Sequence, residues 1–220
     1  MVELTAYEEL TDYRRKVAAM YALVRRPLAS AQAEDEHTRE LKARWRRFRR
    51  SRDLLFASHP QGALDQAQKA VFTGLPYYPY DPGLRFAVRV ERDVEPNVIE
   101  VDLPEDGVVR LKRFGRIRFA VQSQAVTLYL YWIQGYGGGI FLPFRDRTNG
   151  AETYGGGRYL LDTIKHADLG QEDGLLVVDF NYAYNPSCAY NARWHCPLAL
   201  AENWLPAPIR AGELRFPHAV

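Results

Sequence analysis

Carboxylates and an arginine surround the Asn149-Gly150 dipeptide in the segment FRDRTNGAETYGGGRYL. Asn-Gly is typical of tight β-hairpin turns, because these residues adopt positive φ at low cost. Asp146, Glu152 and Arg158 would then lie beside the turn, on one concave face. A carboxylate held there can act as a general acid or base on a substrate anchored by the arginine. The same pairing can also serve only to tie loops together, so the sequence leaves both interpretations open.

A second polar group lies in the segment VVDFNYAYNPSCAY. Asp179 and Asn181 occupy alternate positions of a predicted strand, so their side chains should point the same way. We therefore expect the hairpin and this strand to line one shared pocket. The candidate catalytic residues are Asp146, Glu152 and Asp179, and the candidate ligand-binding residues are Thr148, Tyr154, Arg158, Asn181, Tyr184, Asn185, Glu202 and Asn203.

Two glycine triplets sit in nearly identical segments, YGGGIFL at 136–142 and YGGGRYL at 154–160. A phosphate-binding loop needs its glycines between a strand and a helix, with a Gly-Lys-Ser or Gly-Lys-Thr sequence at its end. Here each triplet leads into a β-prone segment, and no such sequence follows. We interpret the triplets as corners or bulges where strands enter a sheet.

Cys188, His195 and Cys196 are candidates for zinc ligands. A structural zinc ion requires four protein ligands and a catalytic one about three, and the choice of His166 as a fourth has no support in the spacing. The sequence therefore predicts no metal site and leaves any cofactor unknown. The cysteines are equally compatible with a disulfide and with two buried free thiols. A cysteine nucleophile is less favoured, because His195 need not face the neighbouring Cys196.

Residues 1–58 carry apolar positions at helical spacing in two segments. The first runs from Leu4 to Val24 and is ended by Pro27, and the second begins after Ser30 and stops before Pro60. This pattern predicts an N-terminal helical hairpin. Its second helix has a basic face of Lys42, Arg44, Arg46, Arg47, Arg49, Arg50 and Arg52. Nucleic-acid binding is not expected, since no recognition motif accompanies these residues, and the arginines can instead hold the hairpin against an acidic part of the body.

Beyond Phe72 the apolar period changes to two, in short segments separated by Gly, Pro or Asp. Such closely spaced strands leave little room for crossover helices and favour antiparallel pairing. Later strands are expected at Ile140–Arg145, Arg158–Thr163, Leu175–Asn181 and Pro208–Glu213. The predicted fold is α+β, with the hairpin of residues 1–58 packed on a mainly antiparallel β-barrel or β-sandwich body, residues 72–220, that carries the ligand pocket.

The 220 residues contain no run of about 20 apolar residues, which a membrane span requires. The first ten residues, MVELTAYEEL, are acidic where a secretory signal would be basic and then apolar. Two cysteines fit a reducing compartment. We expect a cytoplasmic protein without a membrane partner.

Over most of Phe72–Glu213 the chain resembles a bacterial family known as domain of unknown function 1684. The motifs that carry the resemblance are FTGLPYYPYD, the F-x-D-x-T-x-G-x-x-T-Y-x-x-G-R-Y-L pattern of Phe144–Leu160, DFNYAYNPSCAY, CPL, ENWL and IRAGE. The resemblance implies kinship and carries no activity with it.

These observations predict a protein that binds a small polar or anionic ligand, with carboxylate acid/base catalysis left open. The alternative is a non-catalytic interaction or scaffold protein, whose helical hairpin docks a partner or joins two copies of the chain into a homo-oligomer.

Overall fold

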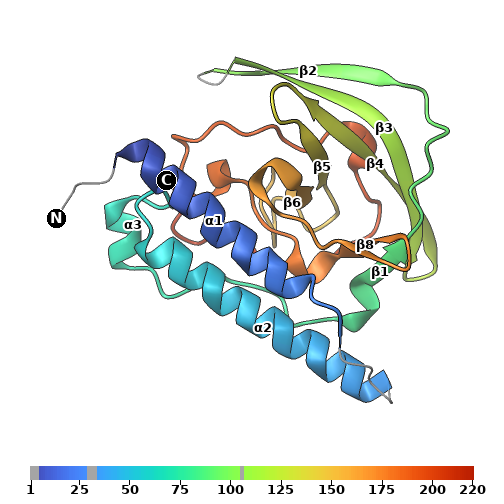
Figure 1. Ribbon diagram of the computed structural model, residues 1–220, viewed down its shortest axis with the longest axis horizontal. Coiled ribbons are helices and arrows are strands. Elements are labelled where there is room, and N and C mark those ends of the chain that lie inside the picture. Colours follow the sequence, from blue (N-terminus) through green and yellow to red (C-terminus); the bar gives the residue numbers. More distant parts are fainter. Residues whose placement is uncertain (1–4, 29–33, 105–106) are drawn as a thin grey trace.

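The computed structural model describes residues 5–28, 34–104 and 107–220. Its helices are α1 (Ala6–Val24), α2 (Glu34–Ser58) and α3 (Gln66–Ala70). Helices α1 and α2 lie side by side along one side of the strands, as Figure 1 shows. The two long helices agree with the predicted hairpin, and α2 ends at Ser58 as expected. Leu4, the first residue of the predicted stripe, lies outside the described residues.

The buried face of α2 holds the hairpin on the body. Trp45 and Phe48 pack with Tyr182, and the Trp45 indole donates to the carbonyl of Asn181 at 2.9 Å. Arg52, which the sequence analysis placed on an exposed basic face, is buried instead. Its guanidinium pairs with the buried Glu213 at 3.3 Å, which is the kind of contact with an acidic part of the body that the alternative interpretation predicted.

The strands form two antiparallel sheets. The larger sheet has the order β2-β3-β4-β5-β6 and the smaller sheet the order β1-β8-β7. The strands are β1 (Arg85–Val88), β2 (Asn97–Leu103), β3 (Gly107–Val121), β4 (Gln124–Gln134), β5 (Gly139–Phe144), β6 (Arg158–Asp162), β7 (Gln171–Glu172) and β8 (Leu175–Asp179). The α+β class and the antiparallel pairing are therefore confirmed.

The main hydrophobic core takes side chains from both sheets. Leu128 and Leu142 of the larger sheet and Val178 of the smaller one belong to the same cluster, together with Phe180. A second cluster joins the hairpin to the smaller sheet through Val177. Within the described residues the strands do not close into a barrel, because β2 and β6 remain the two edges of the larger sheet.

Two predicted strands differ from those observed. Residues 208–213 form no strand, and Glu213 makes only an isolated bridge to Tyr77, because carbonyls of this segment accept hydrogen bonds from Arg158. The strand expected over Leu175–Asn181 ends at Asp179. The Asp179 carboxylate accepts from the backbone N–H of Asn181 and begins a 3-10 turn, η3 (Phe180–Tyr182).

The glycine triplets lie where the chain passes close to other groups. A Cβ at Gly138 would lie 2.7 Å from the Trp132 ring, and one at Gly157 would lie 2.6 Å from the carbonyl oxygen of Phe144. Gly157 also has a φ of +94°, which L residues rarely adopt. The second triplet therefore lets the chain turn sharply into β6, as the corner interpretation predicted.

Among the helices of the described ranges, none has the length and apolar character that crossing a bilayer requires.

Candidate functional site

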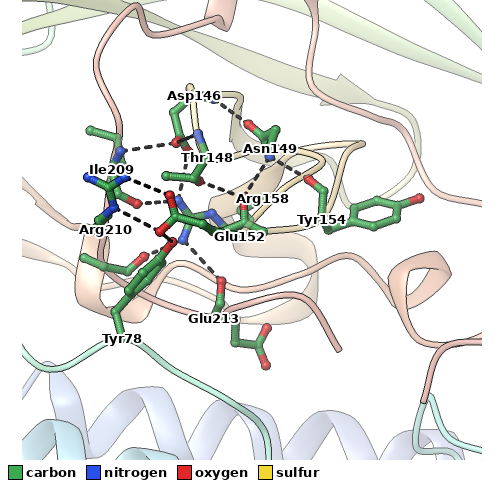
Figure 2. Close-up of polar contacts among 12 residues, drawn as sticks. Tyr78, Asp146, Thr148, Asn149, Glu152, Tyr154, Arg158, Ile209, Arg210 and Glu213 are labelled. Carbon is green, nitrogen blue, oxygen red and sulfur yellow. Dashed lines mark hydrogen bonds and ion pairs between the residues drawn. The ribbon is translucent and has the colours of Figure 1, made fainter. Parts of the chain in front are cut away.

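Arg158 is the centre of a closed polar cluster at the start of β6, drawn in Figure 2. Its side chain is fully buried, and its Nη2 donates to Asp146 Oδ2 and to the carbonyl of Ile209, both at 2.8 Å. Its Nη1 donates to the carbonyls of Ala211 and Glu213. In the described part of the chain only Nε is left without a partner. Through its bonds to the carbonyls of residues 209–213, Arg158 therefore fastens the C-terminal segment to β6.

The loop around Asn149 bonds mainly to itself. Thr148 donates its backbone N–H to Asp146 Oδ1 at 2.8 Å, and its hydroxyl lies 2.8 Å from that of Thr153. The Asn149 amide accepts from the Asp146 N–H and donates to the carbonyl of Tyr154. The loop spans residues 145–157 and is longer than the tight hairpin that Asn-Gly suggested, because these side chains replace a strand ladder in holding it together.

Glu152 lies near the surface beside this cluster (Figure 2). Its carboxylate accepts from Nε and Nη2 of Arg210, at 2.9 and 2.8 Å, and from the Tyr78 hydroxyl at 2.9 Å. The Arg210 hydrogen bonds, followed by the one from Tyr78, lower the pKa of Glu152. Glu152 therefore stays ionised at neutral pH and is poorly suited to donate a proton.

Asp179 and Asn181 form a separate cluster. The side-chain amide of Asn181 bonds both backbone groups of Asp81. It accepts from the Asp81 N–H at 2.8 Å and donates to the Asp81 carbonyl at 2.7 Å. It also donates to Asp179 Oδ1 at 2.8 Å. These bonds fix the turn after β8 to the segment before β1, and Asn181 is fully buried. Asn181 therefore positions the neighbouring backbone. Of the two residues, Asp179 is the one that lines an open space.

That space is a hollow of about 450 Å³ between the hairpin and the smaller sheet. It lies where the end of α1 and the start of α2 face β7, β8 and the beginning of β1. Its volume is within the range of small-molecule sites, roughly 300 to 1,000 Å³. The cationic and imidazole side chains of its wall are Arg25, Arg26, His37, Arg44 and Arg85, and the carboxylates are Glu172, Asp173 and Asp179.

Arg85 and Asp179 are neighbours in the wall of the hollow. Arg85 Nε lies 3.9 Å from Asp179 Oδ2, and Arg85 Nη2 also pairs with Glu172. Burial raises the pKa of Asp179 to about 6, while the hydrogen bonds from Asn181 and the charge of Arg85 act in the opposite direction. A carboxyl group with this pKa exchanges its proton near neutral pH, which is what general acid/base catalysis requires.

Other cations of the wall are engaged in holding the helix ends. Arg44 donates through Nη1 to the carbonyl of Val24, at 3.1 Å, and through Nη2 to Glu40. Arg25 donates to the carbonyl of Asp168 at 2.7 Å. Arg44 and Arg25 also pair with carboxylates, those of Glu40 and Asp168, but each is tied to a backbone carbonyl as well. Arg85 differs from both because, within the described residues, its partners are the carboxylates of Glu172 and Asp179 alone, which a competing anion can replace.

The predicted residues Glu202 and Asn203 brace a different edge of the body. Glu202 accepts from Arg113 Nη1 at 2.7 Å and from the Tyr131 hydroxyl. Asn203 is fully buried and bonds both backbone groups of Tyr129, at 2.8 and 2.9 Å. Both residues therefore fasten η5 (Ala201–Asn203) to β4, and neither belongs to the wall of the hollow.

Tyr184 and Asn185 lie beside the ion pair that joins α2 to the C-terminal segment. Arg52 lies over the Tyr184 ring, and the Asn185 N–H donates to the Glu213 carboxylate. The Tyr190 hydroxyl donates to Glu213 Oε2 at 2.7 Å. The sequence analysis missed Glu213, although IRAGE was noted as a motif, because its partner lies far away in the chain.

The prediction that the Asn149 loop and the Asp179 strand line one shared pocket is therefore wrong. Asp146, Thr148 and Arg158 are joined in one network, while Asp179 faces a hollow that none of them lines. Arg85 was missed as a site residue. Its only signal was a place in the alternating segment LRFAVRV, and its closeness to Asp179 comes from the register of β1 with β8, which pairs the two residues directly.

Within the described residues, no group of three or more His, Cys, Asp or Glu side chains is placed to hold a metal ion. No side chain of the site suggests a particular cofactor.

A family model described as "Protein of unknown function (DUF1684)" matches residues 70–214. The chain therefore belongs to this family, over nearly the same residues that carried the resemblance in the sequence. A search of curated proteins finds no match.

Among solved structures, the chain is similar to an uncharacterized protein of Haloarcula marismortui determined by solution NMR. The two share 29% sequence identity with a TM-score of 0.57, and the match covers 82% of this chain and 97% of the other. This likeness supports the fold and names no activity.

Proposed function

We propose that the protein binds a small anionic molecule in the hollow between the hairpin and the smaller sheet. The observation that carries the proposal is the position of Arg85, whose guanidinium lies in the wall of a space of about 450 Å³. Its side chain is 15% exposed, and that of its partner Glu172 is 47% exposed. A solvated carboxylate contributes little binding energy to such a pair, so a carboxylate or phosphate group of a ligand can take its place.

The position and the raised pKa of Asp179 extend this proposal to acid/base catalysis. It is the only one of the three candidate catalytic residues in the wall of the hollow as lined by the described residues. Its raised pKa, about 6, allows it to accept or donate a proton on a ligand held by Arg85. We propose this acid/base role for Asp179, and no longer for Asp146 or Glu152, whose oxygens are taken by arginine partners.

Docking of a partner by the hairpin has less support. The apolar face of the hairpin packs on Tyr80, Leu169 and Val177 of the body, so this face is already covered. We also propose that the two sheets, which share one core, form a sandwich, and that the protein is cytoplasmic, since its two free cysteines fit a reducing compartment.

The experiment is a thermal-shift and calorimetric screen with inorganic phosphate, citrate and a nucleoside monophosphate as probes. We expect saturable binding of at least one probe to the wild type, at least tenfold weaker binding to Arg85→Gln, and unchanged binding to Arg210→Gln. Arg210 is the matched control, because it also pairs with a partly exposed glutamate but lies outside the hollow. Absence of binding to any probe, or equal binding to both variants, would contradict the proposal.

A further inference from the structure

The hollow between the hairpin and the smaller sheet has an apolar floor. Five of the residues that line it also belong to the hydrophobic cluster that joins the hairpin to this sheet, and they are Val24, Leu41, Leu169, Val177 and Tyr182. Leu169, Val177 and Tyr182 are buried, whereas Val24 and Leu41 are partly exposed. Because these side chains pack in one cluster, the floor is a continuous apolar surface.

The charged group that can hold an anion comes from the smaller sheet. Arg85, Glu172 and Asp179 belong to β1, β7 and β8, and their side chains are joined through the guanidinium of Arg85. On the helix side, the Arg44 guanidinium is already bonded to backbone carbonyls and to a glutamate, and the arginines at 25–26 are exposed to water. The hollow therefore presents Arg85 as its partly buried partner for an anion.

Strand β8 places the charged group directly beside the apolar floor. Val177 and Asp179 are two positions apart, so their side chains point to the same face of the strand, about 6.6 Å from each other. Val178, between them, points to the main core. The pairing of β1 with β8 sets Arg85 opposite Asp179. The boundary between the charged part and the apolar part of the wall therefore crosses β8.

The carboxylates around Arg85 limit the charge that a ligand can carry there. A carboxylate head can pair with the guanidinium through two parallel hydrogen bonds. A second negative charge on the same head would be repelled by Glu172 and Asp179, which both lie within 4 Å of the Arg85 nitrogens. A head of single charge should therefore bind better than one of double charge.

We propose that the ligand is a carboxylate with an apolar body, either a straight aliphatic chain or an aromatic ring, whose head pairs with Arg85 and whose body covers Val177 and Leu41. This inference rests on the proposed function and adds the class of ligand to it. A polar small anion would leave the floor exposed to water, whereas an apolar body removes that surface from water.

The first test is calorimetry at pH 7 with acetate, butanoate, hexanoate and octanoate as probes. Affinity should rise about fourfold for each added methylene, the factor that corresponds to about 0.8 kcal/mol for a buried CH₂ group, until the floor is covered. We expect octanoate to bind at least tenfold more tightly than butanoate.

The outcomes of this series separate the ligand class from the site itself. Equal affinity for butanoate and octanoate, with binding still weakened in Arg85→Gln, would overturn the inference and leave the proposed anion site standing. If no anion binds, or if Arg85→Gln binds every anion as the wild type does, the proposed function fails as well.

The second test uses octanamide, which has the same apolar body without the charge. Octanamide should bind the wild type at least tenfold more weakly than octanoate does, and Arg85→Gln should leave its binding unchanged. Equally tight binding of the two molecules would mean that the apolar surface acts alone, which contradicts a head held by Arg85.

The third test is Leu41→Trp, which should fill part of the floor. Octanoate should bind this variant at least tenfold more weakly, and butanoate should bind it as before, because only the longer body reaches this side chain. The matched control is Leu54→Trp, on the same helix, where the side chain is 68% exposed and does not line the hollow. The control should bind both acids as the wild type does, and equal weakening of both acids by Leu41→Trp would contradict the proposed position of the body.

NMR contacts in the wild type decide the same point if Leu41→Trp fails to fold. The terminal methyl group of bound octanoate should contact the methyl groups of Leu41, and the methylene next to its carboxylate should lie near Arg85. The reverse order of these contacts would overturn the inference.

Discussion

Two arginine–aspartate pairs in this protein use the same residue types for different purposes. The pair of Arg158 and Asp146 is closed: both side chains are fully buried 2.8 Å apart, and the terminal guanidinium nitrogens of Arg158 also serve three backbone carbonyls. The pair of Arg85 and Asp179 is open: its atoms are 3.9 Å apart, and it faces a hollow of about 450 Å³.

The difference shows that residue type alone does not mark a functional site. A guanidinium whose terminal donors are already bonded in the folded protein has little left to offer a ligand, whereas one held by a solvated carboxylate can exchange that partner. In this chain the closed pair carries the stronger sequence motif and fastens the fold, and the open pair belongs to the site that we propose.

The largest effect is expected from breaking the closed pair. Arg158→Met should lower the free energy of unfolding by about 3 to 5 kcal/mol, because it leaves a buried Asp146 carboxylate without its cation. Urea unfolding followed by circular dichroism measures the change.

The control is Arg110→Met, which breaks a pair of the same length on the surface. Arg110 lies 2.8 Å from Glu100, and more than half of each side chain is exposed. This variant should unfold nearly as the wild type does. A similar loss of stability in both variants would mean that burial is not what distinguishes the Arg158 pair.

Asp179→Asn should have the next largest effect on the free energy of unfolding, and it should raise this free energy instead of lowering it. Burial raises the pKa of Asp179 from 3.8 to about 6, so the folded protein binds this proton more tightly than the unfolded chain does. The resulting stabilisation is present below pH 4 and is lost as the pH rises to 6. The asparagine introduced at position 179 keeps a side-chain oxygen that can accept the hydrogen bonds of Asn181, and it carries no charge.

We therefore expect Asp179→Asn to be more stable than the wild type above pH 6, by up to about 3 kcal/mol for a shift of roughly two pKa units. The difference should vanish below pH 4. Thermal unfolding between pH 3 and pH 8 measures it. If the difference in stability between the variant and the wild type is the same at all pH values, the pKa of Asp179 is not raised in the folded protein.

The smallest effects are expected in the titration of Asp179. Arg85→Gln should raise its pKa above about 6, because the nearby cation lowers it, and Glu172→Gln should lower it, because that carboxylate raises it. Carboxyl-carbon NMR titration separates the two outcomes. Shifts of the same sign in both variants would mean that the hollow is rearranged by the substitutions.

The elements with local signals could be predicted from the sequence. The hairpin followed from the spacing of residues such as Trp45 and Phe48 and from Pro27 and Pro60, and these act within a few residues of the chain. Strands β5 and β6 were predicted within one residue at each end, because their apolar runs begin at glycines.

The site was predicted only in part, because it depends on contacts between distant segments. Asp179 was named from its strand position, but its partner Arg85 is set by the pairing of β1 with β8. Arg158 was expected among carboxylates, either to satisfy one of them or to anchor a ligand, and the structure pairs it with Asp146. Nothing local shows that Ile209 and Ala211 supply its other acceptors. The absent strand at 208–213 has the same cause.

The last contacts of the fold have a consequence for its synthesis on the ribosome. Arg52 and its partner Glu213 are 161 residues apart in the sequence, and Arg158 also depends on acceptors between Ile209 and Glu213. Both cations leave the ribosome well before these acceptors exist. The nascent chain must therefore keep both arginines hydrated, and the body can close only after that short stretch has emerged.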